Sequence, residues 1–143
     1  MAMSDTPTAP SIEQLEGASG FARAAGLQLT EASGAKVVGW IDLTAEHHQP
    51  FGIVHGGVYC SAVETAASIG ASSAVMDQGK VAVGVNNNTN FLAQMTEGRV
   101  DVVATPISQG RTQQLWQVEI TRPSDGRLVA TGQVRLQNIT PRP

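Results

Sequence analysis

The feature of the sequence that most constrains the fold is a change of hydrophobic period near residue 56. Apolar residues then recur at spacings of three and four over about five turns, as Val58, Ala62, Ala66, Ile69, Ser73 and Met76. The segment VYCSAVETAASIGASSAVMD carries small side chains and one charge, Glu64, before Asp77. The spacing predicts a helix, buried on most sides, that begins at Gly56-Gly57 and ends at Asp77-Gln78-Gly79.

Alternating patterns on both sides of this helix predict strands. Within residues 27–44, one face of the expected strand pair carries Val37, Gly39, Ile41 and Leu43. Further strands are expected over residues 81–85, 100–107, 116–120 and 128–137. Asp125-Gly126 predicts a hairpin between the last two. Asn86, Asn87, Asn88 and Asn90 are interpreted as an irregular edge that interrupts a strand.

The order of these elements favours an α+β fold, in which a curved antiparallel sheet wraps one long central helix. Two short helices are expected before the first strand, one near residues 11–14 and one over residues 21–25 that Gly26 stops. Residues 1–10 are expected to form a disordered tail and residues 11–140 a single domain. The sheet leaves one face or edge uncovered, so we expect self-association as a homodimer or larger.

Composition excludes several classes of partner. The net charge is −3, and the nine Lys and Arg residues are scattered, so nucleic acid is not an expected partner. Apolar runs fall short of the roughly 20 residues that cross a bilayer, and no secretory pattern opens the sequence, so we expect no membrane contact and a cytoplasmic location. The single cysteine, Cys60, agrees with a reducing compartment.

The stretch HHQPFGIVHGGVYCSAVE, residues 47–64, raises three possible chemistries. The spacing of His47, His48 and His55 matches no standard zinc pattern, so no metal is expected. Cys60 lies within the expected buried helix, where nothing argues for an activated thiol. The sequence contains no Gly-x-Ser-x-Gly motif, so it does not support an α/β-hydrolase.

Gly56 and Glu64 are the informative pair. The N-terminus of a helix presents free N–H groups and a positive dipole end, and Gly56 would let a substrate carbonyl approach them. Glu64 lies eight residues further along, about 12 Å at 1.5 Å per residue, so one helix cannot bring both groups to one carbon atom. If both act on one substrate, Glu64 comes from a second chain. Ser68 shares its helix face and could hold a water, and Gln49 could supply an amide donor.

Structural roles remain open for the same residues. Glu64 could be a core carboxylate that is satisfied by a neighbouring N–H group. His55 could cap the helix, and Ser68 could be only a small helix residue. The residues alone do not decide between these roles.

The segment HQPFGIVHGGVYCSAVETAAS closely resembles the signature of hotdog-fold acyl-CoA thioesterases, in the branch that contains phenylacetate-pathway and 4-hydroxybenzoyl-CoA thioesterases. The resemblance runs from about Gly26 to Leu136. Its later landmarks, in order, are Asn88 and Asn90 with Phe91, Glu97-Gly98, Gly110-Arg111-Thr112, and the segment from Asp125 to Ala130.

This resemblance implies an active site between two subunits, commonly in a dimer of dimers, a homotetramer. Gly56 would polarise the thioester carbonyl, with Gln49 and His55 orienting it. Glu64 of the partner subunit would be the nucleophile or general base, and Ser68 would position the water. Coenzyme A would lie along two sets of residues, namely Phe91, Leu92 and Ala93 for the pantetheine and Gly110, Arg111 and Thr112 for the phosphates. The acyl or aryl group would contact Ala62, Ala66 and Ile69.

The implied reaction is hydrolysis of an acyl-CoA or aryl-CoA thioester, which needs no separate cofactor because coenzyme A belongs to the substrate. A thioester has a good leaving group, so one carboxylate and one oxyanion site suffice. Two alternatives remain at this point. A 3-hydroxyacyl thioester dehydratase would use His55 as its main base, and a non-catalytic acyl-CoA binding protein would use Glu64 only structurally.

Overall fold

The computed structural model describes residues 10–17 and 19–143 of the chain. The tail expected over residues 1–10 therefore lies outside the described residues, apart from Pro10. Two short helices, α1 (Ile12–Gly17) and α2 (Gly20–Ala25), precede the sheet as predicted. Ser19 caps α2 by accepting a hydrogen bond from the backbone of Ala22, and Gly26 ends it in the left-handed region at φ 85°.

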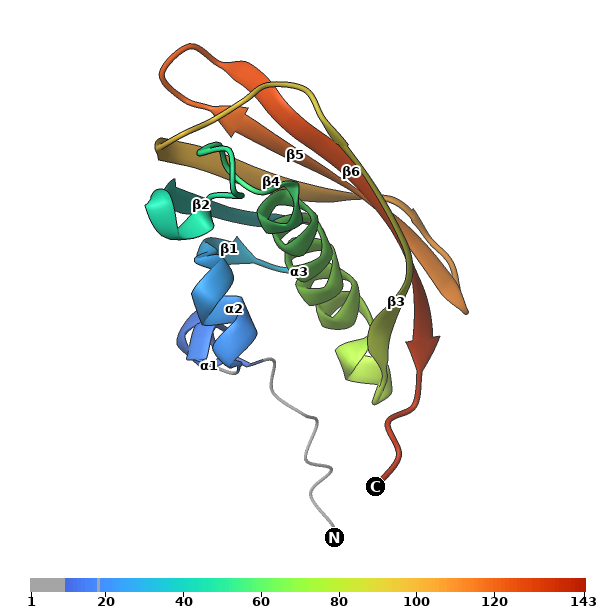
Figure 1. Ribbon diagram of the computed structural model, residues 1–143. Coiled ribbons are helices and arrows are strands. Elements are labelled where there is room, and N and C mark those ends of the chain that lie inside the picture. The colour runs from blue at the N-terminus through green and yellow to red at the C-terminus, as the bar shows by residue number, and fades with distance from the viewer. Residues whose placement is uncertain (1–9, 18) are drawn as a thin grey trace, which may run out of the picture.

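Six antiparallel strands form one sheet in the order β1-β2-β4-β5-β6-β3 (Figure 1). They are β1 (Gln28–Ala32), β2 (Val37–Leu43), β3 (Val81–Phe91), β4 (Gly98–Gln109), β5 (Gln113–Arg122) and β6 (Arg127–Ile139). The predicted buried face of β2 is confirmed, since Val37, Gly39, Ile41 and Leu43 are all buried. The turn from β5 to β6 contains Asp125 and Gly126, with Gly126 at φ 71°, as the hairpin prediction requires.

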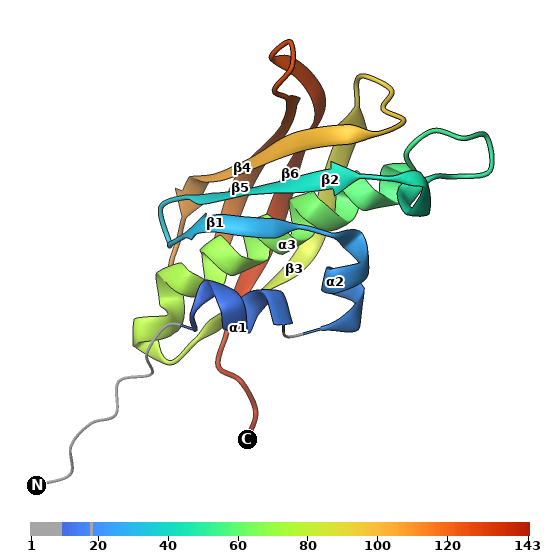
Figure 2. The same ribbon diagram turned by 90° about the vertical axis from the view of Figure 1, so that its left-hand side faces the viewer.

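The long helix α3 (Gly56–Val75) lies against the sheet, which curves around it (Figures 1 and 2). A 3₁₀ turn (Met76–Gln78) and Gly79, at φ 69°, end it where the sequence predicted. Every residue of α3 is buried or half-buried. The expected α+β fold, in which a curved antiparallel sheet wraps one long helix, is therefore confirmed.

The residues that showed the helical spacing are not all among the most buried residues of α3, although the helix is buried on most sides as predicted. The buried positions are Tyr59, Ala62, Val63, Ala66, Ala67, Gly70, Ala71 and Val75. Val58 and Ile69 are half-buried beside the core. The sheet covers a wider sector of the helix than a single row, because small side chains allow strands to approach it from several directions.

The structure confirms that the asparagines lie at an irregular, exposed edge of the sheet, but they do not interrupt a strand. Asn86, Asn87, Asn88 and Asn90 lie within β3 and pair with β6, with a bulge between Gly84 and Asn86. Backbone pairing with β6 outweighs the low strand propensity of asparagine. β3 is nevertheless an edge strand, and Val83, Val85 and Phe91 expose much of their side chains. Among the described residues, no helix has the length and apolarity that crossing a membrane requires.

Candidate active site

The N-terminus of α3 presents a backbone donor without a partner. His55 caps the helix, with its Nδ1 accepting a hydrogen bond from the Gly57 N–H at 2.8 Å. The Val58 N–H bonds to the carbonyl of His55 at 3.0 Å. None of the hydrogen bonds formed by the described residues uses the Gly56 N–H. This group therefore lies at the positive end of the helix dipole, free to bind a ligand oxygen.

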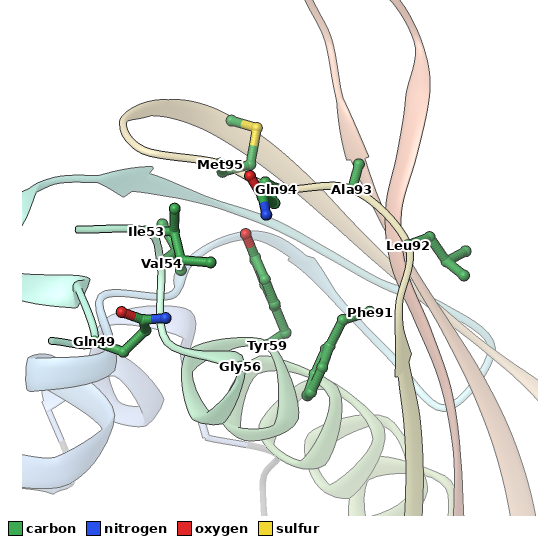
Figure 3. A pocket seen from close by; sticks show the side chains of 10 residues that line it. All are labelled: Gln49, Ile53, Val54, Gly56, Tyr59, Phe91, Leu92, Ala93, Gln94 and Met95. Carbon is green, nitrogen blue, oxygen red and sulfur yellow. The ribbon is translucent and has the colours of Figure 1, made fainter. Parts of the chain in front are cut away.

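A cavity of about 290 Å³ opens beside this donor (Figure 3). Its lining consists of Gln49, Ile53, Val54, Gly56, Tyr59, Phe91, Leu92, Ala93, Gln94 and Met95. The structure thus brings together five predicted site residues: Gln49, Gly56 and the segment 91–93. The Phe91 ring covers Gly56 so closely that a Cβ atom there would lie 2.5 Å from it. The Oε1 atom of Gln49 accepts a hydrogen bond from the Phe51 N–H. This bond fixes the orientation of the Gln49 side-chain amide within the loop.

Sequence reasoning missed the other five lining residues, and Tyr59 is the one among them with an ionisable side chain. Its side chain is 3% exposed, its ring centroid lies 6.0 Å from that of Phe91, and its hydroxyl has no hydrogen-bond partner among the described residues. Burial raises the pKa of Tyr59 to about 12, so the hydroxyl stays protonated at neutral pH. In Figure 3 the hydroxyl points away from the helix, toward the side of the cavity formed by Val54 and Gln94. The spacing of three residues from Gly56 was the available signal, because it places both on one helix face.

His55 lies on the other side of the helix start, in a second cavity of about 460 Å³. This cavity is lined by Phe21, Ala24, Ala25, Glu46, His47, His48, His55, Gly57, Val58 and Ser61. His55 therefore does not line the same cavity as Gln49 and Gly56. The capping role left open for it is confirmed by the bond from Gly57.

The other two histidines also have local partners. The Nδ1 atom of His47 accepts a hydrogen bond from the Thr44 N–H at 3.0 Å, and the Nε2 atom of His48 lies 2.6 Å from the Thr96 carbonyl. In the part of the chain that the structure describes, no group of three or more His, Cys, Asp or Glu side chains is placed to hold a metal ion.

Glu64 lies two turns along α3 and lines neither cavity. Its carboxylate faces the edge strand β3, where the Asn87 amide donates a hydrogen bond to Oε2 at 3.0 Å. Ser68 lies one further turn along the helix and is half-buried. Within one chain, Gly56 and Glu64 therefore point to different sites, as the spacing on the helix required.

The two sets of predicted coenzyme A contacts lie at opposite ends of β6. Phe91 pairs with Ala130 on β6. The turn that contains Gly110, Arg111 and Thr112 is bonded to Asn138, since the Asn138 N–H donates to Thr112 and its amide donates to Gly110 and Arg111. Eight residues of strand, about 26 Å, separate Ala130 from Asn138. One chain therefore does not bring these two sets together.

The expected acyl contacts require a correction. Ala62 and Ala66 are each 1% exposed and belong to the core under the sheet, so they do not line either cavity. Ile69 is half-buried beside the core. The small residues of α3 serve close packing against the sheet. The cavity beside Gly56 is lined mainly by the loop before the helix and by residues 91–95.

A curved antiparallel sheet wrapped around one long central helix is the hotdog fold. Residues 51–129 match the sequence profile of the Thioesterase superfamily. The chain belongs to this superfamily and is a thioester hydrolase. The fold and enzyme class expected from the sequence are confirmed.

Relatives agree with this assignment. A Mycobacterium tuberculosis protein, Rv1847, whose name describes it provisionally as an esterase, is 45% identical over 120 residues, covering 82% of this chain and 85% of that protein. The 1,4-dihydroxy-2-naphthoyl-CoA hydrolase of Listeria monocytogenes is 34% identical, covering 71% of this chain and 82% of the relative. The structure of thioesterase HI1161 from Haemophilus influenzae superposes with a TM-score of 0.82 at 29% identity, covering 92% of each chain.

Proposed function

We propose that the protein hydrolyses acyl-CoA or aryl-CoA thioesters to the free acid and coenzyme A, at a site shared by two chains. The observation that carries this proposal is the unbonded Gly56 N–H, which lies at a helix N-terminus and beside an apolar cavity. A thioester carbonyl that entered the cavity would place its oxygen at this donor. The names of the hydrolase relatives support a coenzyme A thioester as the substrate.

The Gly56 N–H would stabilise the charge that develops on the carbonyl oxygen during attack. A preorganised donor of this kind contributes about 3 to 4 kcal/mol in acyl transfer, and the helix dipole adds to it. Gln49 would orient the thioester from the same cavity. A full catalytic triad is unnecessary, because the thiolate leaving group does not have to be protonated before it departs.

Glu64 of the partner subunit would supply the carboxylate. As a general base it would take a proton from a water held by Ser68, and the water oxygen would attack the carbonyl carbon as the carbon–sulfur bond breaks. As a nucleophile it would attack the carbon itself, and water would then hydrolyse the resulting anhydride. The exposed edge β3 supports a homodimer that brings the two chains together, as the building unit of a homotetramer.

Coenzyme A would contact both chains. Its pantetheine arm would pass Phe91, Leu92 and Ala93, which line the cavity of one chain. Its phosphates would meet Gly110 and Thr112 and the guanidinium of Arg111 of the partner subunit, because the same turn of the first chain lies at the far end of the sheet. No separate cofactor is needed for this chemistry.

The dehydratase alternative is less well supported. It needs His55 as the main base, but the Nδ1 atom of His55 already accepts the Gly57 N–H, and the ring lines the other cavity. The binding-protein alternative predicts that Glu64 is dispensable for chemistry, which activity assays can test directly.

The first experiment measures release of the free thiol from benzoyl, phenylacetyl, hydroxylated aryl and aliphatic CoA esters. We expect wild type to hydrolyse one subgroup and Glu64→Gln to lose at least a hundredfold in kcat. Glu31→Gln, which removes an exposed carboxylate on β1, is the control for lost charge. An active Glu64→Gln variant would exclude the proposed role of this carboxylate.

Gly56→Pro tests the oxyanion donor. Proline is favoured at the first position of a helix, where it removes the N–H and adds a Cβ atom that contacts Phe91. The extended backbone of His55, at φ −65° and ψ 130°, suits a following proline. Gly56→Ala adds the same contact with Phe91 but keeps the donor, so it should retain more activity. Mixing Gly56→Pro with Glu64→Gln should restore about a quarter of wild-type activity, because half of randomly formed dimers carry one intact site. A mixture without activity would contradict the two-chain site.

A further inference from the structure

We propose that Asn87 is a positioning residue that fixes the Glu64 carboxylate, that Thr89 orients Asn87, and that Gly84 provides the space for the carboxylate. We call these three residues of β3 the carboxylate seat. This inference rests on the proposed function and deepens it, because it explains how a flexible side chain is held ready for catalysis. None of the three residues would touch the substrate.

The hydrogen bonds of Asn87 leave its amide one orientation. Its Nδ2 group donates to Glu64 Oε2 at 3.0 Å and to the Cys60 carbonyl at 3.2 Å. Its Oδ1 atom accepts a hydrogen bond from the Thr89 hydroxyl at 2.7 Å. A rotated amide would direct Oδ1 toward two acceptors and lose the bonds to Glu64 and Cys60. The donor is therefore held toward the carboxylate by three partners from two elements.

Glycine is required at the other side of the carboxylate. A Cβ atom at Gly84 would lie 2.0 Å from Glu64 Oε1 and 3.0 Å from its Cδ atom. The bulge between Gly84 and Asn86 lies next to this contact. Oε1 therefore lies against the strand, while Oε2 is bound by the amide. This arrangement selects one rotation of the carboxylate plane.

A second glycine makes room for the residue that orients the amide. A Cβ atom at Gly132 on β6 would lie 2.7 Å from the Thr89 hydroxyl and 2.8 Å from Val63 of α3. Thr89 is half-buried there, next to the pairing of β3 with β6. The pairing of β3 with β6 therefore fixes the geometry of the carboxylate seat, because it sets the positions of the backbone that carries Thr89 and Gly132.

A fixed carboxylate acts in the turnover step. Holding a reacting group in its productive geometry lowers the barrier without changing how the substrate binds elsewhere. Asn87→Leu keeps a similar volume and removes the donor, so we expect kcat to fall by on the order of tenfold to a hundredfold with KM within about twofold. Gly84→Ala should cause a comparable loss, because the added methyl group displaces Oε1.

Thr89 gives a matched pair of variants. Thr89→Val removes the hydroxyl and should lower kcat by several-fold, whereas Thr89→Ser keeps it and should restore wild-type turnover. If Thr89 acts only through Asn87, the double variant Asn87→Leu/Thr89→Val should be no slower than Asn87→Leu alone. Asn86→Ala on the same strand is the control, because the Asn86 side chain forms none of the hydrogen bonds found among the described residues.

The assay uses the full chain and a CoA ester that wild type hydrolyses, with melting temperature and molar mass by light scattering measured for each variant. Turnover losses in variants of unchanged mass and stability support the inference. With Glu64→Gln inactive, three results would each overturn the inference. They are a wild-type kcat in Asn87→Leu, additive losses of kcat in the double variant, and losses of kcat that occur only in variants whose molar mass shows dissociation. If Glu64→Gln is itself active, the proposed function fails and not the seat alone.

Discussion

The two ends of α3 differ in whether their buried polar side chains have hydrogen-bond partners. At the C-terminal end, Gln114 is 1% exposed and fully engaged: it donates to the Ala71 carbonyl and to Asn138, and accepts from the Trp116 indole, each at 2.9 Å. At the N-terminal end, the Tyr59 hydroxyl is buried and has no partner among the described residues. An unsatisfied buried group costs about 1 to 3 kcal/mol. Among the described residues, a buried polar side chain without a partner occurs only at the end of α3 that has the unbonded Gly56 N–H and the cavity.

The packing around glycine residues also differs between the two ends of α3. At the C-terminal end, a Cβ atom at Gly70 would lie 2.4 Å from the buried ring of Trp116, and one at Gly34 would lie 2.7 Å from the backbone of Ala74. At the N-terminal end, Gly56 is covered by Phe91, whose side chain is 54% exposed. The C-terminal end is covered by the buried ring of Trp116, whereas the N-terminal end is covered by the ring of Phe91, which is more than half exposed. The difference separates the part of the helix that stabilises the fold from the part that is available to a ligand.

The largest effect is expected from Gln114→Leu. The substitution keeps the volume but removes partners from the Ala71 carbonyl, Asn138 and Trp116, all of which stay buried. We expect unfolding free energy to fall by about 3 to 5 kcal/mol, measured by urea denaturation, with unchanged kcat for the protein that remains folded. Stability close to that of wild type would show that the C-terminal end does not depend on satisfied polar groups.

Tyr59→Phe should have the opposite effect. Removing a buried hydroxyl that lacks a partner relieves its desolvation cost, so we expect the free energy of unfolding to rise by about 1 kcal/mol without ligand. Thermal unfolding of the two proteins side by side measures this difference. A destabilised variant would mean that the hydroxyl has a partner in solution, and the contrast between the ends of α3 would then be lost.

The smallest effect concerns the turn from β5 to β6, near the cavity. The hydrogen bond from Arg122, followed by that from the Arg127 backbone, lowers the pKa of Asp125 from 3.8 to about 2. The carboxylate therefore adds stability above about pH 4, and that contribution is lost as the pH falls through 2. Asp125 is solvent-exposed and Arg122 is only half-buried, so solvent screens the pair and the gain is small. Asp125→Asn should melt slightly below wild type at pH 7, and the two melting curves should converge near pH 2; a constant difference would contradict this.

The course of the chain could be predicted from the sequence, because the change of period at Gly56 and the alternation in β2 are local signals. The residues that showed the helical spacing do not mark the most buried side of α3, since a helix covered on most sides has no sharp apolar face. The asparagines of β3 were wrongly expected to interrupt a strand, because pairing with β6 is not visible in local propensity. Both errors arise where tertiary contacts outweigh local preference.

The site was predictable to the extent that it depends on one helix. The separation of Gly56 and Glu64 follows from helical rise alone. The contact of Glu64 with Asn87 joins residues 23 positions apart, and only the folded sheet brings them together. Ala62 and Ala66 were wrongly expected to contact the acyl group, because their small size suits a ligand pocket and a close-packed core equally well.

In the proposed two-chain site, the position of β3 at the edge of the sheet would make catalysis depend on assembly. Among the described strands of one chain, β3 pairs with β6 alone, although it carries Asn87 and ends at Phe91. Strands with one free edge open more readily than central strands. In the proposed two-chain site, a second copy would secure the strand and supply the missing carboxylate in a single event. A newly synthesised chain would then have no activity until it binds a second copy, and the monomer would not be an active enzyme.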